Sequence, residues 1–218
     1  MRFIRPTAVL LSLLMLSSCT ILDKLGFDTY DYMSETVTQT HEAEGETALM
    51  LSDVLNILVT DSPELVTFEH MGDAIKAYRD AVLDYMLETG YSKYSGNTAL
   101  MSEAAEKYPE YSITQLIPER EFEATMYRYF GGDVMITHSD GSRFKYLEKV
   151  SAYVSAVPMS DSGYRAEITA VSETDKTYRV WFFVSSETIR SDDYFALIIK
   201  RDDGTLYIKK LLKAADVE

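Results

Sequence analysis

The chain has 218 residues, a formal net charge of −14 and a 46% share of hydrophobic residues. The length suits one sizeable folded domain, and the acidity excludes the cationic footprint that nucleic-acid binding requires. We therefore expect no nucleic-acid partner. The same charge disfavours flat adsorption on anionic lipid, so attachment to a membrane would need a separate device.

The N-terminal segment has the features of an export signal, and it ends at the single cysteine of the chain. Arg2 and Arg5 give a positive start, residues 8–16 form an almost wholly apolar run, and small residues precede Cys19. The apolar run is shorter than the about 20 residues of a membrane-spanning helix. Removal of residues 1–18 leaves a net charge of −16, because two arginines and no acids are lost.

The order Leu16-Ser17-Ser18-Cys19 resembles the lipobox of bacterial lipoproteins. The resemblance implies a diacylglyceryl group on the Cys19 sulfur, cleavage just before Cys19, and acylation of the new N-terminus by a fatty acid such as palmitate. Two or more buried chains give stable anchoring, so the lipid bilayer is the expected partner. The expected location is the cell membrane or outer membrane, facing outside the cytoplasm. An ordinary secretory signal with an incidental cysteine is the alternative.

After the signal peptide (residues 1–18), we expect a lipidated cysteine with an acidic, flexible tether over residues 19–46. One α+β domain is expected over residues 47–214. The tether is rich in acids, Lys24 is its only lysine or arginine, and its apolar periodicity is weak. A docking arm that uses Phe27, Tyr30 and Tyr32 is the alternative interpretation.

Helical patterns occupy residues 47–130, where apolar residues recur at spacings of three and four. Capping and breaking residues then predict where the later helices begin and end. The predicted boundaries are Ser62 and Pro63 with Gly90, Asn97 with Lys107, and Pro118 with Gly131.

From residue 133 onward the apolar period changes to two, which predicts strands. We expect a hairpin over residues 133–149 that turns at Asp140-Gly141, a strand over 149–157, and hairpins turning near residues 173–175 and 202–204. The fold is therefore predicted as α+β, with N-terminal helices packed on a C-terminal curved antiparallel sheet of four to six strands. The element order over residues 118–213 resembles the nuclear-transport-factor-2-like, or cystatin-like, cone superfamily, which implies a cone-shaped sheet around a cavity.

Catalytic and metal-binding motifs are missing from the sequence. It contains no G-x-S-x-G motif, and its histidines, His41, His70 and His138, form no closely spaced metal-binding pair. Cys19 is assigned to lipid. We therefore expect no enzyme activity, no cofactor and no metal site.

One constellation suggests a pocket at the mouth of the predicted cone, with His138 as its titratable centre and Asp133 or Asp140 as a carboxylate partner. The candidate lining is Tyr127, Phe130, His138, Arg143, Tyr146, Tyr153 and Trp181. Members of the cone superfamily use such a cavity for small ligands, and some place a catalytic pair in it. The simpler interpretation is a set of core aromatics and a solvated histidine at a hairpin tip.

The leading hypothesis is a membrane-anchored extracytoplasmic lipoprotein that acts as a non-enzymatic binding or interaction module of the cell envelope. Its partner would be an envelope protein or a small ligand. A cone-type carrier or enzyme that uses the aromatic pocket near His138 is the alternative, and a purely structural lipoprotein is the third interpretation.

Overall fold

A computed structural model of the chain describes residues 30–59, 62–132, 135–155 and 163–217. The lipobox Leu16-Ser17-Ser18-Cys19 and the candidate partner Asp133 lie outside the described residues. The chain divides into two units, Met1–Glu35 and Thr36–Glu218. In the described part of the first unit, one short 3-10 helix is present, η1 (Tyr32–Ser34).

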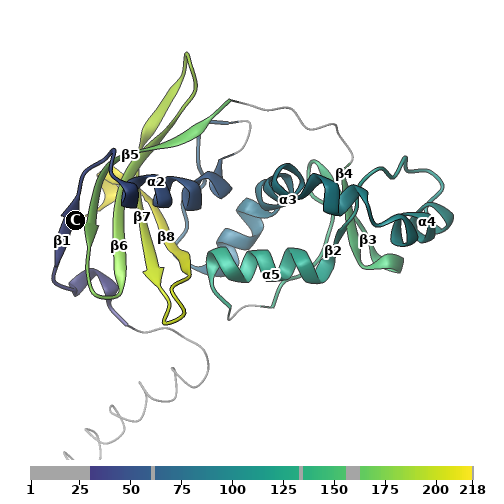
Figure 1. Cartoon of the computed structure of the whole chain (residues 1–218), viewed down its shortest axis with the longest axis horizontal. Helices are drawn as coiled ribbons and strands as arrows, with labels where there is room; N and C mark the ends of the chain where they lie inside the picture. Colours follow the sequence, from purple (N-terminus) through teal and green to yellow (C-terminus); the bar gives the residue numbers. More distant parts are fainter. Residues whose placement is uncertain (1–29, 60–61, 133–134, 156–162, 218) are drawn as a thin grey trace, which may run out of the picture. The chain divides into compact units, whose positions relative to one another are not determined.

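The second unit contains a five-stranded antiparallel sheet with the strand order β1-β5-β6-β7-β8 (Figure 1). The strands are β1 (Gln39–His41), β5 (Arg165–Glu173), β6 (Thr177–Ser185), β7 (Arg190–Lys200) and β8 (Leu206–Lys213). β5 with β6 and β7 with β8 form two hairpins, as the sequence predicts. Gly204, in the second turn, has a φ of +80°, which glycine adopts without a side-chain clash.

Strand β1 lies in a segment that the sequence analysis assigned to the tether. Gln39–His41 pairs with Glu173–Val171 of β5, and Thr38 donates a backbone hydrogen bond of 2.7 Å to Glu173. The folded unit therefore begins at Thr36, well before residue 47.

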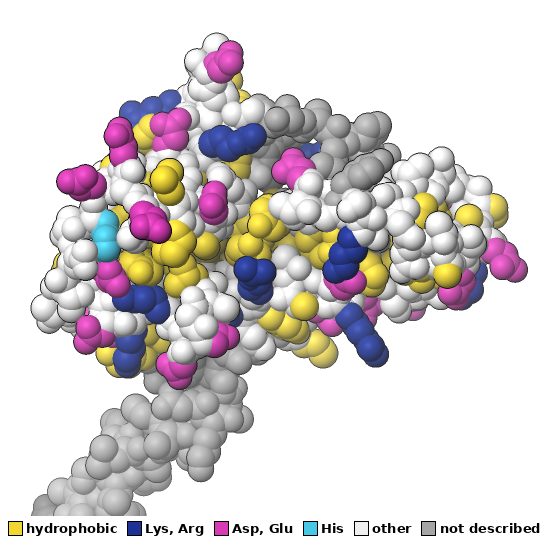
Figure 2. Space-filling view, viewed as in Figure 1, with side chains coloured by type: hydrophobic (Ala, Val, Ile, Leu, Met, Phe, Trp, Pro, Cys, Tyr) yellow, Lys and Arg dark blue, Asp and Glu magenta, His cyan; other side chains and the backbone are white. Residues whose placement is uncertain are grey.

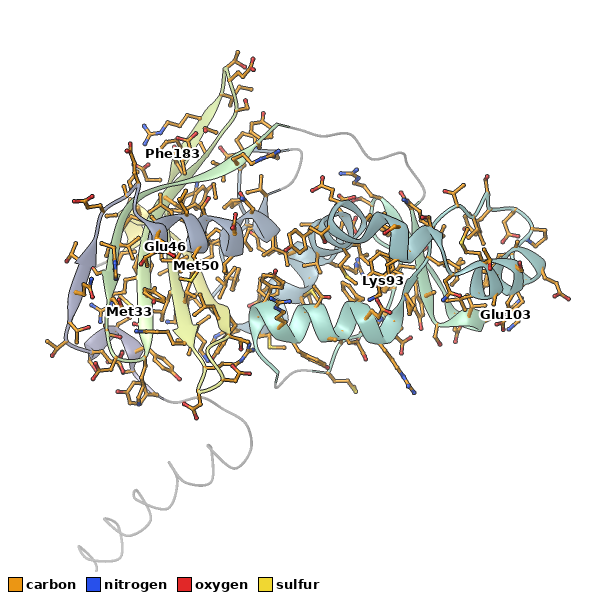
Figure 3. The ribbon with its side chains drawn as sticks, viewed as in Figure 1. Met33, Glu46, Met50, Lys93, Glu103 and Phe183 are labelled. Atoms are coloured by element: carbon orange, nitrogen blue, oxygen red, sulfur yellow. The ribbon has the colours of Figure 1, made fainter. Side chains whose placement is uncertain are left out.

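The helices are α2 (Glu46–Leu55), continued by the 3-10 turn η2 (Asn56–Leu58), then α3 (Met71–Ser95), α4 (Thr98–Lys107) and α5 (Glu119–Phe130). A final 3-10 turn, η4 (Ala214–Asp216), follows β8. α2 packs against β5 and α5 packs against the edge strand β8, so helices pack on the sheet as predicted. α3 packs along α5, where the Lys93 ammonium (labelled in Figure 3) lies 2.5 Å from the Glu121 carboxylate.

The predicted helix start at Ser62 and Pro63 is wrong. α3 begins at Met71, because the backbone of Phe68 pairs with that of Leu211 through two hydrogen bonds of 2.8 Å. The predicted end at Gly90 is confirmed in part. Gly90 has non-helical φ and ψ and ends the first helical stretch of α3, but a second helical stretch follows across a kink and continues to Ser95.

A second, three-stranded sheet has the order β2-β4-β3, formed by β2 (Ile117–Pro118), β3 (Phe144–Leu147) and β4 (Ala152–Ser155). β3 and β4 are joined through the 3-10 turn η3 (Glu148–Val150) and Ser151, whose φ is 47°. The hairpin predicted to turn at Asp140-Gly141 is therefore wrong. Residues 135–143 form no strand, and the true hairpin turns after Leu147.

Within the described residues, no helix combines the length and the apolar character that a bilayer span requires. The face shown in Figure 2 carries Asp and Glu side chains interspersed with Lys and Arg, without one extended basic area.

Candidate site around His138

Three elements bring polar side chains together at the start of α5. Pro118 ends β2 and is the residue before the helix, so Glu119 and Glu123 fall one turn apart on one face of α5. The backbone amide of Glu119 donates a 2.9 Å hydrogen bond to the carbonyl of Ser151. This bond fixes the helix start to the hairpin that carries Tyr146 on β3 and Tyr153 on β4.

His138 is the centre of this cluster. Its Nε2 atom lies 3.2 Å from Glu123 Oε1 and 3.8 Å from Glu119 Oε1. Its Nδ1 atom lies 2.9 Å from the Tyr153 hydroxyl, and the Tyr146 hydroxyl donates a hydrogen bond to Glu119. Each ring nitrogen therefore has a partner, and so does the Glu119 carboxylate.

Aromatic rings hold the imidazole in place. The ring of Tyr146 stacks on that of His138 with centroids 5.1 Å apart, and Phe122 meets it edge to face. The His138 side chain is only 12% exposed, against 26% for Glu119 and 30% for Glu123. Solvent therefore reaches the cluster from the carboxylate side.

Both phenols remain neutral over the physiological pH range. Burial raises the pKa of Tyr153 to about 12. Burial, with the hydrogen bond to Glu119, also raises the pKa of Tyr146 to about 12. Neutral phenols can donate one hydrogen bond and accept others, so they can orient the imidazole and the carboxylate without adding charge.

The segment that carries His138 is fastened to α3. Asp80 Oδ2 accepts hydrogen bonds from the backbone amides of Ser142 and Arg143, at 2.8 and 3.0 Å. Arg79 donates to the carbonyl of Ser139 at 3.1 Å. A Cβ atom at Gly141 would lie 1.9 Å from Asp80 Oδ1, so only glycine lets the carboxylate approach this closely.

The structure brings together three of the predicted pocket residues, His138, Tyr146 and Tyr153. Arg143 instead forms a 2.9 Å ion pair with Asp84 and lines a separate surface cavity of about 320 Å³. The second candidate partner of His138, Asp140, accepts hydrogen bonds from Lys145 and from the Tyr146 amide.

The other predicted lining residues lie away from His138. Phe130 belongs to the main core, where its ring stacks on Tyr78, and Tyr127 packs against the same core. Trp181 packs edge to face against Phe195 on the larger sheet. Glu119 and Glu123 are absent from the residues that the sequence analysis singled out as candidates for this site. Their spacing of four residues was the available signal, because it places both carboxylates on one helix face.

A second histidine cluster serves to hold β1 on the sheet. The Glu173 carboxylate lies 2.5 Å from His41 Nε2 and 2.6 Å from Lys200 Nζ. Lys200 also donates to the carbonyl of Thr174. Because both carboxylate oxygens are occupied by cross-strand partners, we assign this cluster a structural role.

Comparisons with known proteins add no identity: no family model, curated protein or solved structure matches the chain.

Proposed function

We propose that the chain is a lipid-anchored extracytoplasmic lipoprotein whose folded unit acts as a non-enzymatic binding module of the cell envelope, with its binding site around His138. The observation that carries the anchoring is the lipobox-like order Leu16-Ser17-Ser18-Cys19, which contains the chain's only cysteine and follows a short apolar run. Acyl chains on Cys19 would attach the acidic chain to the bilayer without any basic surface.

The chemistry around His138 supports binding over nucleophilic catalysis. In the described part of the chain, its hydrogen-bond and ion-pair partners are two carboxylates and a phenol. None of these is a serine, threonine or cysteine that the imidazole could activate. The arrangement offers oxygen and nitrogen donors at a partly solvated position, which suits recognition of a cationic ligand.

The second candidate function is a small-ligand carrier or enzyme that uses the same cluster. It is favoured by one observation, the hydrogen-bonded series Glu123–His138–Tyr153, which could move a proton between a bound molecule and solvent. Unlike the non-enzymatic binding module, this function requires an organic ligand that contacts His138. Native mass spectrometry of the lipoprotein from its own organism would reveal that ligand as a stoichiometric added mass.

Metabolic labelling tests the anchoring. The full chain and the Cys19→Ala variant are expressed in a bacterial host supplied with an alkyne analogue of palmitate, and the membrane fraction is probed for the label. We expect label in the wild type and none in Cys19→Ala. Ser18→Ala is the matched control, because alanine keeps the small residue before the cysteine and should leave labelling unchanged. A wild-type chain that carries no palmitate label would refute the proposal, even if that chain stays in the membrane fraction.

A further inference from the structure

We propose that Glu119, Glu123 and His138 form a binding site for a divalent transition-metal ion, with Zn²⁺ as the best-suited probe. The proposal deepens the binding function above by naming the class of ligand, and it rests on the same cluster. The donor atoms of these three residues all lie within 4.8 Å of one another.

The spacing of the donors fits coordination to a single ion. Two ligands that each lie about 2.1 Å from a tetrahedral ion are about 3.4 Å apart. His138 Nε2 and Glu123 Oε1 are 3.2 Å apart, so this pair needs almost no rearrangement. Glu119 Oε1, at 3.8 Å from the same nitrogen, needs a shift that a side-chain rotation can supply.

The negative charge of the two glutamates also favours binding of a cation. Glu119 and Glu123 are like charges one helical turn apart, an arrangement that destabilises a helix unless it is compensated. Among the described residues, the only ion-pair partner of either carboxylate is His138. A divalent ion would neutralise both carboxylates and leave the imidazole neutral.

Neighbouring hydroxyl groups are placed as partners that orient metal ligands. With the metal on Nε2, His138 Nδ1 keeps its proton and donates it to the Tyr153 oxygen, 2.9 Å away. The Tyr146 hydroxyl donates to Glu119. Hydrogen bonds of this kind fix the tautomer of a ligating histidine and the orientation of a ligating carboxylate.

The mixed donor set selects the class of metal. Ca²⁺ and Mg²⁺ prefer sites made of oxygen alone, whereas imidazole with carboxylate suits Zn²⁺ and its first-row neighbours. Three protein donors leave a fourth position for water or for a group from a partner. The partial exposure of the two glutamates gives the ion a route from solvent.

The test is calorimetric titration of the full mature lipoprotein in detergent, after treatment with a chelator and dialysis. We expect one equivalent of Zn²⁺ to bind and no binding of Mg²⁺ or Ca²⁺ at the same concentrations. His138→Gln and Glu123→Gln should each weaken Zn²⁺ binding by at least tenfold, and Tyr153→Phe by roughly tenfold through loss of the hydrogen bond to Nδ1.

Matched controls separate this site from general binding to an acidic chain. His70→Gln and Glu106→Gln change exposed residues outside the cluster and should leave the affinity unchanged. X-ray absorption at the zinc edge of the Zn²⁺-loaded wild type tests the site without any variant, so it does not depend on whether the variants fold. The spectrum should show nitrogen and oxygen ligands and no sulfur. Zn²⁺ binding that is equal in the wild type and in a folded His138→Gln variant would overturn the proposal, as would an absence of stoichiometric binding.

The outcome can be distinguished from failure of the anchoring proposal, because palmitate labelling at Cys19 does not depend on His138. Labelling without Zn²⁺ binding would refute the metal site and leave the lipoprotein assignment standing. Zn²⁺ binding without labelling would do the reverse.

Discussion

Replacement of Gly141 by alanine should destabilise the protein by displacing Asp80. The added Cβ would lie 1.9 Å from Asp80 Oδ1, 2.6 Å from its Cγ and 2.7 Å from Oδ2, and all three distances are shorter than real Cβ contacts. The carboxylate must therefore move away and lose its hydrogen bonds to Ser142 and Arg143. Hydrogen bonds to a charged group contribute about 1.5–3 kcal/mol each.

Water can replace part of this loss, because Ser142 is exposed. We therefore expect the free energy of unfolding to fall by about 2–4 kcal/mol. For a domain of this size that corresponds to a decrease in Tm of about 5–15 °C. Thermal unfolding of the full mature chain, followed by circular dichroism, measures the change.

Two further variants make the prediction refutable. Gly72→Ala, in α3, has no atom within 4 Å of the added Cβ and should be neutral or slightly stabilising. In an Asp80→Ala background the clash is gone, so Gly141→Ala should cost almost nothing further. A cost that is the same in both backgrounds would show that the reasoning about Asp80 is wrong.

Two other predictions concern the larger sheet and the end of α5. Burial raises the pKa of Glu173, but hydrogen bonds from Lys200 and His41 outweigh it, so the net pKa lies below the usual range. Its stabilising contribution is therefore complete above the unfolded-state pKa of about 4.3 and is lost as the pH falls through the lower folded-state pKa. Glu173→Gln should cost about 1–2 kcal/mol in urea unfolding at pH 7, and the difference from wild type should shrink below pH 4. Gly131 ends α5 with a φ of +93°, and a Cβ atom added at this position would lie 3.3 Å from the Tyr207 side chain. Gly131→Ala should therefore cost about 1–3 kcal/mol in the same assay.

Each of these predictions has a result that contradicts it. If the difference in the free energy of unfolding between wild type and Glu173→Gln grows toward acid pH, the pKa of Glu173 is raised by folding and not lowered. A Gly131→Ala variant as stable as wild type would mean that the backbone leaves the positive-φ region without cost.

The larger sheet could be predicted because its signals are local. The alternation of β6 places Val180, Phe182 and Val184 on the buried face, and the turn at Asp203-Gly204 identifies the next hairpin. The same alternation assigns Trp181 to the opposite face, which is a reason to exclude it from a pocket lined by core residues.

The misplaced elements depend on residues that are distant in the sequence. Ser62 and Pro63 are good start signals for a helix, but pairing of Phe68 with Leu211 keeps the following residues extended. Asp140-Gly141 has the composition of a hairpin turn, yet Asp80 from α3 binds the amides just after it. A single sequence gives no sign of such partners.

Only part of the site around His138 could be predicted, because some of its residues are also distant in the sequence. His138, Tyr146 and Tyr153 lie close together in the sequence, which is why the sequence predicts that they meet. The predicted acidic partners, Asp133 and Asp140, are likewise close to His138 in the sequence. The acids that contact His138 come instead from the face of α5 that carries Glu119 and Glu123. The helix pattern predicts that these two glutamates share a face, and the packing of α5 against the smaller sheet decides what that face meets.

The most direct test of the metal site is an anomalous difference map from crystals of the mature protein soaked with Zn²⁺ and recorded at the zinc absorption edge. We expect a peak within coordination distance of Glu119, Glu123 and His138, and we expect that peak to be lost in Glu123→Gln crystals. The metal site would be contradicted if these three side chains are well ordered and no peak lies between them. Zinc peaks found only elsewhere in the crystal would also contradict it.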